Sequence, residues 1–408
     1  MFRKILFLDY HTFDKEDIED AFRYLGYEVV ETDIPMTYKG NEEKIKEELS
    51  ILIKRKDIDM VFSSNYFIEA SKECACHNVP YVSWTYDSPR IQLYDRTVKN
   101  ACNYIFIFDS SEYNRLVNKG VHRVFYLPLG VNVERLDAIN ISQQDAERYS
   151  ADVSLVASLY NEKANFYDRM EPLLSDYARG YVQALVEAQK NLTCGSVLEE
   201  AAGNPQILSD MINAIPYKLK EGSLTDHTYV YGNYVLARKA SSLQRIKFIR
   251  DISRMCRMKV YTPGDISDIP EAIDMGVVDY KEEACKVFRC SKINLNITLA
   301  SIQSGIPLRA IVIMGSGGFL LTNYQADFDG LFEPGIDYVY YTSIEDAKEL
   351  IRYYLENDEE REIIAQNGYN KVKQAFTYRS LIEQMMEMIY DSMGVKYHEK
   401  GGGNSSVL

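Results

Sequence analysis

The sequence predicts an α/β protein made of two Rossmann-like domains that face each other across a cleft. Two observations lead to this fold class. The chain has 408 residues, which is too long for one ordinary domain. In both halves, short apolar segments of strand length alternate with segments of helical periodicity, and this alternation is typical of parallel sheets with crossover helices.

The first domain is expected to cover residues 1–138. Strands are predicted at 4–9, 27–32, 58–63, 81–86, 104–108 and 124–127, and helices at 15–25, 42–55, 67–76 and 111–119. No G-x-G-x-x-G motif follows the first strand, so the sequence gives no support for a dinucleotide-binding domain. The polar residues 140–150 are expected to form a linker.

The second domain is expected to cover residues 151–392. Its first strand is predicted at 152–159, and a long helical insertion of about residues 165–255 follows it. Further strands are predicted at 258–262, 293–298, 319–322 and 337–341, and helices at 282–289, 308–315, 344–357, 359–375 and 379–392. Residues 396–408 are polar and glycine-rich, which predicts a disordered tail.

Composition limits the function. The net charge of −14 and the pI near 5.0 argue against a general nucleic-acid-binding protein. Seven scattered cysteines show no disulfide framework, and no signal peptide is visible, so a reduced, cytoplasmic location is expected. Cys74, Cys76 and His77 lie close together, but no second cluster follows at zinc-like spacing, which favours packing over metal binding.

Loops at the carboxyl ends of parallel strands line a cleft. In the first domain, Asp87 follows the fourth predicted strand and is the candidate general base, although an Asp-Ser-Pro turn can equally cap the next helix. His11 is a second candidate base or a polar surface residue. Tyr10, Trp84 and Arg90 are assigned to the side of the cleft where a second substrate, the acceptor, is expected to bind.

The segment 293–322 contains a strand, a polar loop, a helix, a glycine break and a second strand. Arg309 lies just inside the helix, after the loop from Ser301 to Gly305. Backbone N–H groups and the helix dipole favour an anion at such a place, and arginine can add a bidentate contact to a phosphate. Alternatively, Arg309 is a solvated side chain and the glycines at 315–318 only end the helix.

The same segment resembles a known family. IPLRAIVIMGSGGFLLT is similar to the C-terminal domain of the CgeB-like (spore maturation protein) glycosyltransferases, which have the two-domain GT-B fold. The matching residues are Pro307, Leu308, Arg309, Gly315, Gly317, Gly318, Phe319 and Thr322. YVSWTYDSPR resembles the N-terminal domain of that group at Trp84, Asp87, Ser88 and Pro89. The segment YLPLGVN at 126–132 resembles the connection between GT-B domains.

This resemblance implies a nucleotide-sugar site in the second domain, with the last helix crossing back onto the first. The implied donor-binding residues are Ser158, Tyr261, Val278, Tyr280, Ser301, Gly305, Arg309, Val312 and Gly317. Val312 departs from the family pattern, which carries Asp there to hold the ribose hydroxyls. Valine accepts no hydrogen bond, so donor binding is expected to be weaker by roughly ten- to a hundredfold.

The expected function is transfer of a sugar from a nucleotide sugar to a polysaccharide, glycolipid or protein acceptor. No cofactor is expected and the reaction is predicted to be metal-independent, because the Asp57-Ile58-Asp59 triplet precedes a strand and so lies at the wrong end of the sheet. The alternative, favoured by Val312, is a catalytically impaired GT-B-like protein that binds another enzyme. An epimerase or phosphorylase on the same fold ranks last. Peripheral membrane contact, the oligomeric state, and an inverting or retaining outcome stay open.

Overall fold

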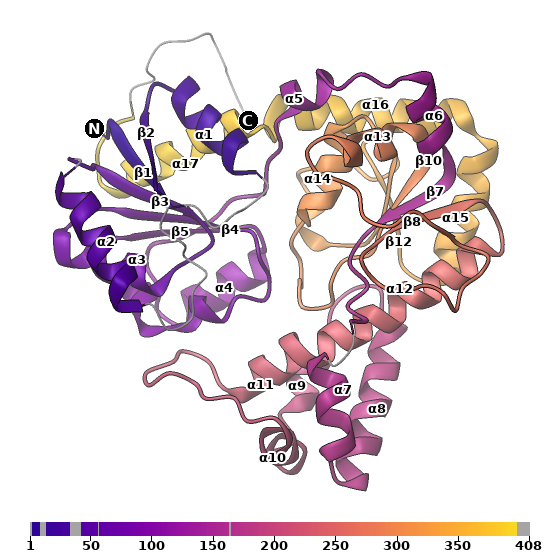
Figure 1. The fold of residues 1–408 in the computed structure, drawn as a ribbon, viewed down its shortest axis with the longest axis horizontal. Coiled ribbons are helices and arrows are strands. Elements are labelled where there is room, and N and C mark those ends of the chain that lie inside the picture. Colours follow the sequence, from indigo (N-terminus) through magenta and orange to yellow (C-terminus); the bar gives the residue numbers. More distant parts are fainter. Residues whose placement is uncertain (1, 9–13, 33–41, 56, 163–164, 398–408) are drawn as a thin grey trace.

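The computed structural model describes residues 2–8, 14–32, 42–55, 57–162 and 165–397. The predicted disordered tail therefore falls outside the described residues from position 398 onward. Two sheets, each with six parallel strands, form the centres of two domains. They lie side by side, and a group of helices extends from the second domain (Figure 1).

The sheet of the first domain has the strand order β2-β1-β3-β4-β5-β6. Its strands are β1 (Lys4–Leu8), β2 (Glu28–Thr32), β3 (Met60–Ser64), β4 (Tyr81–Thr85), β5 (Asn103–Ile107) and β6 (Val124–Tyr126). The central strands β3, β4 and β5 are buried at every position, as expected for a sheet covered on both faces. The helices are α1 (Lys15–Tyr24), α2 (Glu42–Arg55), α3 (Ile68–His77) and α4 (Ser110–Asn118), with the short 3₁₀ turns η1 (Ile91–Tyr94) and η2 (Arg96–Lys99) after β4.

Two short helices connect the domains, α5 (Val133–Asp137) and α6 (Gln143–Tyr149). Helix α6 lies within the polar run 140–150 for which the sequence predicted a linker. Ser142 and Asp145 form a capping box at its start, with each side chain bonded to the other residue's backbone N–H group. This capping explains why a polar segment is helical here.

The sheet of the second domain has the order β12-β11-β10-β7-β8-β9. The strands are β7 (Ala151–Val156), β8 (Met258–Tyr261), β9 (Ile273–Asp274), β10 (Ser291–Asn296), β11 (Leu320–Asn323) and β12 (Val339–Tyr341). The sequence did not predict β9, because this edge strand has two exposed residues and no apolar pattern. The helices around this sheet are α13 (Glu283–Cys290), α14 (Leu308–Gly315), α15 (Ile344–Glu356) and α16 (Asp358–Ala375), with the turn η5 (Ala326–Phe328).

A helical insertion lies between β7 and β8 and has a core of its own. It contains α7 (Phe166–Met170), η3 (Glu171–Leu173), α8 (Asp176–Lys190), α9 (Leu198–Ala202), α10 (Pro205–Ala214), α11 (His227–Val230), the π-helical turn η4 (Tyr231–Leu236) and α12 (Ala237–Ser253). It projects from the second domain below the gap between the two sheets (Figure 1).

The last helix, α17 (Tyr378–Ser392), returns to the first domain and packs beside α1 (Figure 1). Its apolar residues, among them Leu381, Met385 and Ile389, belong to the same buried cluster as Phe22 and Trp84. The hydroxyl group of Tyr390 accepts a hydrogen bond of 2.7 Å from the backbone N–H of Phe2. The core of the first domain is therefore completed by a segment from the end of the chain.

Candidate functional site

A cavity of about 590 Å³ lies between the two domains. It is lined by segments that follow the carboxyl ends of β3, β4 and β5 on one side and of β7, β8 and β10 on the other, together with the start of α14. Parallel α/β sheets place ligands at such strand ends. The volume lies within the roughly 300–1,000 Å³ typical of small-molecule sites.

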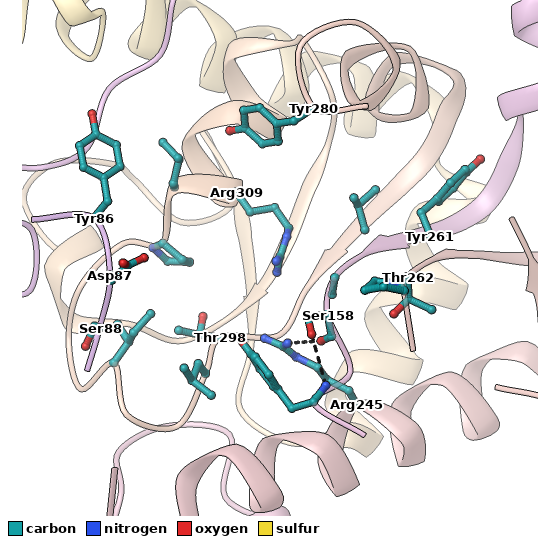
Figure 2. Close-up of a pocket in the computed structure, with 18 of the residues that line it drawn as sticks. Tyr86, Asp87, Ser88, Ser158, Arg245, Tyr261, Thr262, Tyr280, Thr298 and Arg309 are labelled. Atoms are coloured by element: carbon teal, nitrogen blue, oxygen red, sulfur yellow. Dashed lines mark hydrogen bonds between the residues drawn. The ribbon is translucent and has the colours of Figure 1, made fainter. Parts of the chain in front are cut away.

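Arg309 lies in the first turn of α14 and extends from the second domain into the cavity (Figure 2). It donates a hydrogen bond of 3.2 Å to the side-chain oxygen of Asn296. Among the described residues, no carboxylate forms an ion pair with it. Burial and the nearby Arg245 lower the pKa of Arg309 to about 10, so it remains charged at neutral pH.

Arg245 belongs to α12 of the helical insertion and is 2% exposed. It donates to the backbone oxygens of Ser158 and Ile297, which follow β7 and β10. Its guanidinium group also lies 5.0 Å from the ring centre of Tyr160, a favourable cation–π distance. Within the described part of the chain it has no acidic partner. The second domain therefore supplies two arginines to the cavity, and neither is neutralised by a carboxylate there.

The opposite wall carries Asp87, whose side chain is 56% exposed. Asn65 holds this loop, because its side-chain oxygen accepts the backbone N–H groups of Tyr86 and Asp87, both at 3.0 Å. Its side-chain nitrogen donates to the Asp87 carboxylate at 3.1 Å. Arg90 lies 3.4 Å from the same carboxylate oxygen. Asp87 is thus fixed by two neighbours while it still faces the cavity.

The structure brings together some of the site residues that the sequence indicated. Those that line the cavity are Asp87, Ser158, Tyr261, Val278, Tyr280 and Arg309. Tyr261 contributes little polar surface, because it is 2% exposed and its ring points away from Arg309 (Figure 2). The predicted residues Tyr10 and His11 lie outside the described residues.

Other predicted residues do not line the cavity. Trp84 is fully buried in β4 and its ring packs edge-on against Tyr378 of α17. Arg90 is 8% exposed and, besides its contact with Asp87, donates to the backbone oxygen of Tyr66. Both residues therefore support the first domain, and neither offers surface to an acceptor in this cavity.

The same holds for two predicted donor-binding residues of α14 and the turn after it. Val312 is 2% exposed and packs in the core of the second domain. Gly317 lies beyond the far end of α14, where its φ of +79° favours glycine. Val312 and Gly317 do not reach the cavity because successive helix residues point in different directions and only the first turn of α14 faces it.

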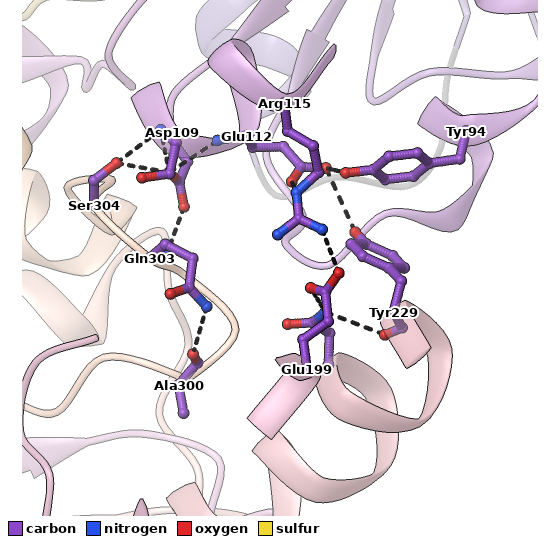
Figure 3. A network of polar contacts seen from close by, with 11 residues as sticks. Tyr94, Asp109, Glu112, Arg115, Glu199, Tyr229, Ala300, Gln303 and Ser304 are labelled. Carbon is purple, nitrogen blue, oxygen red and sulfur yellow. Dashed lines mark hydrogen bonds and ion pairs between the residues drawn. The ribbon is translucent and has the colours of Figure 1, made fainter. Parts of the chain in front are cut away.

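The loop that contains Ser301 and Gly305 contacts the first domain (Figure 3). The Asp109 carboxylate accepts hydrogen bonds of 2.8 Å from the Gln303 backbone N–H and from the Ser304 hydroxyl group. A Cβ atom on Gly305 would lie 2.9 Å from the Asp109 Cα atom, so this position requires glycine. Ser301 donates to the backbone oxygen of Ser88 at 3.5 Å. In this arrangement the loop joins the two domains.

A second polar network joins the first domain to the helical insertion (Figure 3). Glu112 of α4 accepts a hydrogen bond of 2.7 Å from the Tyr94 hydroxyl group. Arg115 of the same helix forms an ion pair of 2.6 Å with Glu199 of α9. Burial raises the pKa of Glu112 to about 7. The Arg115–Glu199 ion pair therefore holds the insertion against α4, beside the largely buried carboxyl group of Glu112.

Sequence reasoning placed Tyr160 and Asn65 in loops at the cleft without assigning them a role, and it did not select Arg245. Tyr160 and Asn65 do follow predicted strands, so their place at strand ends was a usable signal. Arg245 lies in the helical insertion, and nothing in its own segment shows that this helix packs beside the strand ends. The signal that the sequence offers for Arg245 is its spacing of seven residues from Arg238, which places both arginines on one face of α12.

The comparisons with known proteins agree with this architecture. Residues 244–387 match the model of a family described as glycosyl transferase-like. HepE from Anabaena, solved in complex with UDP, has a TM-score of 0.53 at 10% identity over 95% of this chain and 100% of that chain. Sucrose-phosphate synthase from Thermosynechococcus elongatus has a TM-score of 0.56 at 9% identity over 96% and 99%. The fold is GT-B.

A glycosyltransferase from Rickettsia africae shares this GT-B fold, with a TM-score of 0.51 at 11% identity over 96% of this chain and 99% of that chain. HepE has also been solved with UDP-glucose. A comparison with curated proteins gave no match. The predicted fold class is confirmed, including the helical insertion in the second domain. Among the described residues, no helix combines the length and the apolar character needed to cross a bilayer.

Proposed function

We propose that this GT-B protein transfers a sugar from a nucleotide-sugar donor to a hydroxyl group of an acceptor. The observation that carries the proposal is the pair Arg245 and Arg309. Two guanidinium groups without a carboxylate partner among the described residues face one cavity, although the chain as a whole carries a net charge of −14. Two like charges close together, one of them buried and the other partly buried, favour an anionic ligand. A nucleotide diphosphate supplies the matching charge.

In the proposed reaction, the oxygen of the acceptor hydroxyl group forms a bond to the anomeric carbon of the sugar. The bond from that carbon to the diphosphate breaks, and the nucleotide diphosphate leaves with the electron pair. Arg309 is placed to stabilise the charge that develops on the leaving group. Asp87, on the opposite wall, is the residue to accept the acceptor proton if the reaction inverts the anomeric centre.

Because Arg245 and Arg309 supply positive charge to the cavity, we expect transfer without a metal ion. Hexosyl transfer, a polysaccharide, glycolipid or protein acceptor, the CgeB-like subfamily and a cytoplasmic location remain predictions from the sequence. The alternative of a catalytically impaired binding protein rested on Val312. Val312 packs in the core and is not among the residues that line the cavity, so the structure gives no reason to favour that alternative.

Thermal unfolding with UDP, GDP, ADP and CDP, each with and without magnesium, tests the donor site. A nucleotide at about a hundred times its dissociation constant adds roughly 2.7 kcal/mol to the free energy of unfolding. We expect one nucleotide to stabilise the protein without metal, and Arg309→Gln to abolish the effect. Arg352→Gln, at an exposed arginine on α15, is the matched control. An unchanged melting temperature with all four nucleotides would contradict the proposal.

A further inference from the structure

A second hollow of about 210 Å³ opens beside the cavity and shares Tyr160 with it. It is formed by the start of α7, the π-helical turn η4 and the first turn of α12. We call it the basic groove and define it by six of its lining residues, Tyr160, Phe166, Arg169, Tyr234, Arg238 and Lys239. Single π-helical turns often occur at functional sites, because the extra residue redirects side chains.

The charges of the basic groove are only partly neutralised. Lys239 forms an ion pair of 2.8 Å with Asp168. Neither Arg169 nor Arg238 has a side-chain hydrogen bond or an ion pair with any described residue, and Glu162 is the acidic residue that lines the same hollow. The Nε atom of Arg238 is buried and without a hydrogen-bond partner in the described part of the chain. A buried N–H donor without an acceptor costs free energy, unless a bound ligand supplies the acceptor.

Elsewhere in this acidic chain, several partly buried arginines have acidic partners. Arg135 pairs with Asp17 at 2.9 Å, and Arg115 pairs with Glu199. Against this background, the unpaired arginines form a connected row. Arg238 and Arg245 lie 5.6 and 5.0 Å from the ring centre of Tyr160, and the charge of Arg245 acts on Arg309. Positive charge therefore continues from the cavity into the basic groove.

Aromatic surface accompanies this charge. Phe166 is 48% exposed, and the guanidinium group of Arg169 lies 5.4 Å from its ring centre. Tyr160 has a φ of +53°, a strained value for a tyrosine, at the point where the cavity meets the groove. Aromatic rings provide flat apolar faces on which the C–H faces of sugar rings can pack. Charge and aromatic surface together fit a ligand that is both anionic and built of sugars.

We propose that the basic groove binds the acceptor and that the acceptor is an anionic sugar chain carrying phosphodiester or carboxylate groups. Arg169 and Arg238 bind the anionic groups, Phe166 packs against a sugar ring, and the end of the chain passes Tyr160 to reach the donor. The role of the ligand as the acceptor rests on the proposed transfer function. Its chemical class, an anionic sugar chain, rests only on the residues of the basic groove.

Binding of labelled hexamers to the full chain tests the inference. The probes are oligogalacturonate, a hexose hexamer joined by phosphodiesters, and neutral maltohexaose. We expect at least one anionic hexamer to bind, with an affinity that falls as salt is added. Arg169→Gln and Arg238→Gln should each lower this affinity roughly tenfold, whereas Arg352→Gln should not change it. The two anionic probes distinguish carboxylate from phosphodiester recognition.

Full affinity in both Arg169→Gln and Arg238→Gln would overturn the inference, as would equal binding of maltohexaose. Equal binding of a hexaglutamate peptide would mean that the groove binds acidic polypeptides instead. Nucleotide stabilisation, measured on the same variants, separates the two proposals. If a nucleotide stabilises the protein but no anionic hexamer binds, the groove proposal is wrong and the transfer function stands. If an anionic hexamer binds but no nucleotide stabilises the protein, the ligand class of the groove stands and the transfer function is wrong.

Discussion

The two walls of the cavity differ in charge and in rigidity. The second domain contributes Arg245 and Arg309, and Arg245 is 2% exposed and bonded to two strand-end carbonyl groups. The first domain contributes Asp87, whose side chain is 56% exposed and held by Asn65 and Arg90. A fixed positive wall suits ligand binding, whereas an exposed carboxylate suits taking a proton from a group that enters later. Substitutions on the two walls should therefore separate affinity from rate.

The largest expected effect lies on the carboxylate wall. Asp87→Asn should lower kcat by about 10²–10⁴-fold in an inverting reaction, because the amide cannot take up the acceptor proton. The nucleotide dissociation constant should stay within twofold of wild type, since the arginines are untouched. Steady-state transfer assays combined with nucleotide titration measure both quantities. An equal loss of rate and nucleotide affinity would break the division between the two walls.

The second effect concerns the contact that holds the walls together. Asp109→Ala should lower the free energy of unfolding by about 3 kcal/mol, because the buried Ser304 hydroxyl group and the partly buried N–H groups of Ser111 and Gln303 lose their bonds to this carboxylate. Chemical denaturation of the purified protein measures this change. Asp176→Ala, at an exposed aspartate on α8, is the control and should change stability by less than about 0.5 kcal/mol. A similar small change in Asp109→Ala would show that the contact is not maintained in solution.

The third effect depends on pH and concerns the support behind the carboxylate wall. The pKa of Glu112 is about 7 in the folded protein and near 4.5 in an ordinary environment, because the folded protein buries it beside Asp109 and Glu199. The folded state therefore holds the proton more tightly, and stability is lost as pH rises from about 4.5 through 7. The total loss is of the order of 3 kcal/mol. Tyr94 donates to Glu112 in either form.

Glu112→Gln mimics the protonated side chain and should remove this loss. We expect the variant to match wild type at pH 4.5 and to exceed it in stability at pH 8. The measurement is the difference between the two unfolding curves across pH, in which contributions of all other groups cancel. Parallel stability profiles for the two proteins would mean that folding does not change the pKa of Glu112.

The smallest expected effect sharpens the description of the positive wall. Without ligand, Arg309→Gln should raise the free energy of unfolding by about 1 kcal/mol, because it removes a partly buried charge next to Arg245. Glutamine keeps a side-chain donor at this position but carries no charge. Thermal unfolding of the ligand-free variant, with Arg352→Gln as control, measures the change. A fall in stability would mean that the fold itself, rather than a ligand, requires this arginine.

The fold could be predicted from the sequence because buried strands and helix periodicity are local signals. The strand-end positions of Asp87 and Ser158 and the helix-start position of Arg309 follow from the parallel α/β topology, which is why the sequence located them. Val312 and Trp84 were different, since the direction of a side chain depends on the rotation of its element against the core. Both are buried.

Arg245 could not be located from the sequence for a related reason. It reaches the cavity from the helical insertion, and the position of α12 beside β7 and β10 is a long-range packing result. Gly305 shows the same limit in another form. Its pattern indicated a ligand-binding loop, but its lack of a side chain allows the close approach of Asp109. Local sequence cannot tell whether the close neighbour of a glycine is a ligand or another domain.

The return of α17 to the first domain also affects how this protein is made on the ribosome. The last strand of the first sheet ends at Tyr126, but the residues that complete its core begin at Tyr378. About 250 residues must be synthesised between them, which takes roughly 12 to 50 seconds at usual translation rates. During this time the apolar face that later receives α17 lacks its partner. We therefore expect chaperones to bind the nascent chain most strongly in the period before α17 has been synthesised.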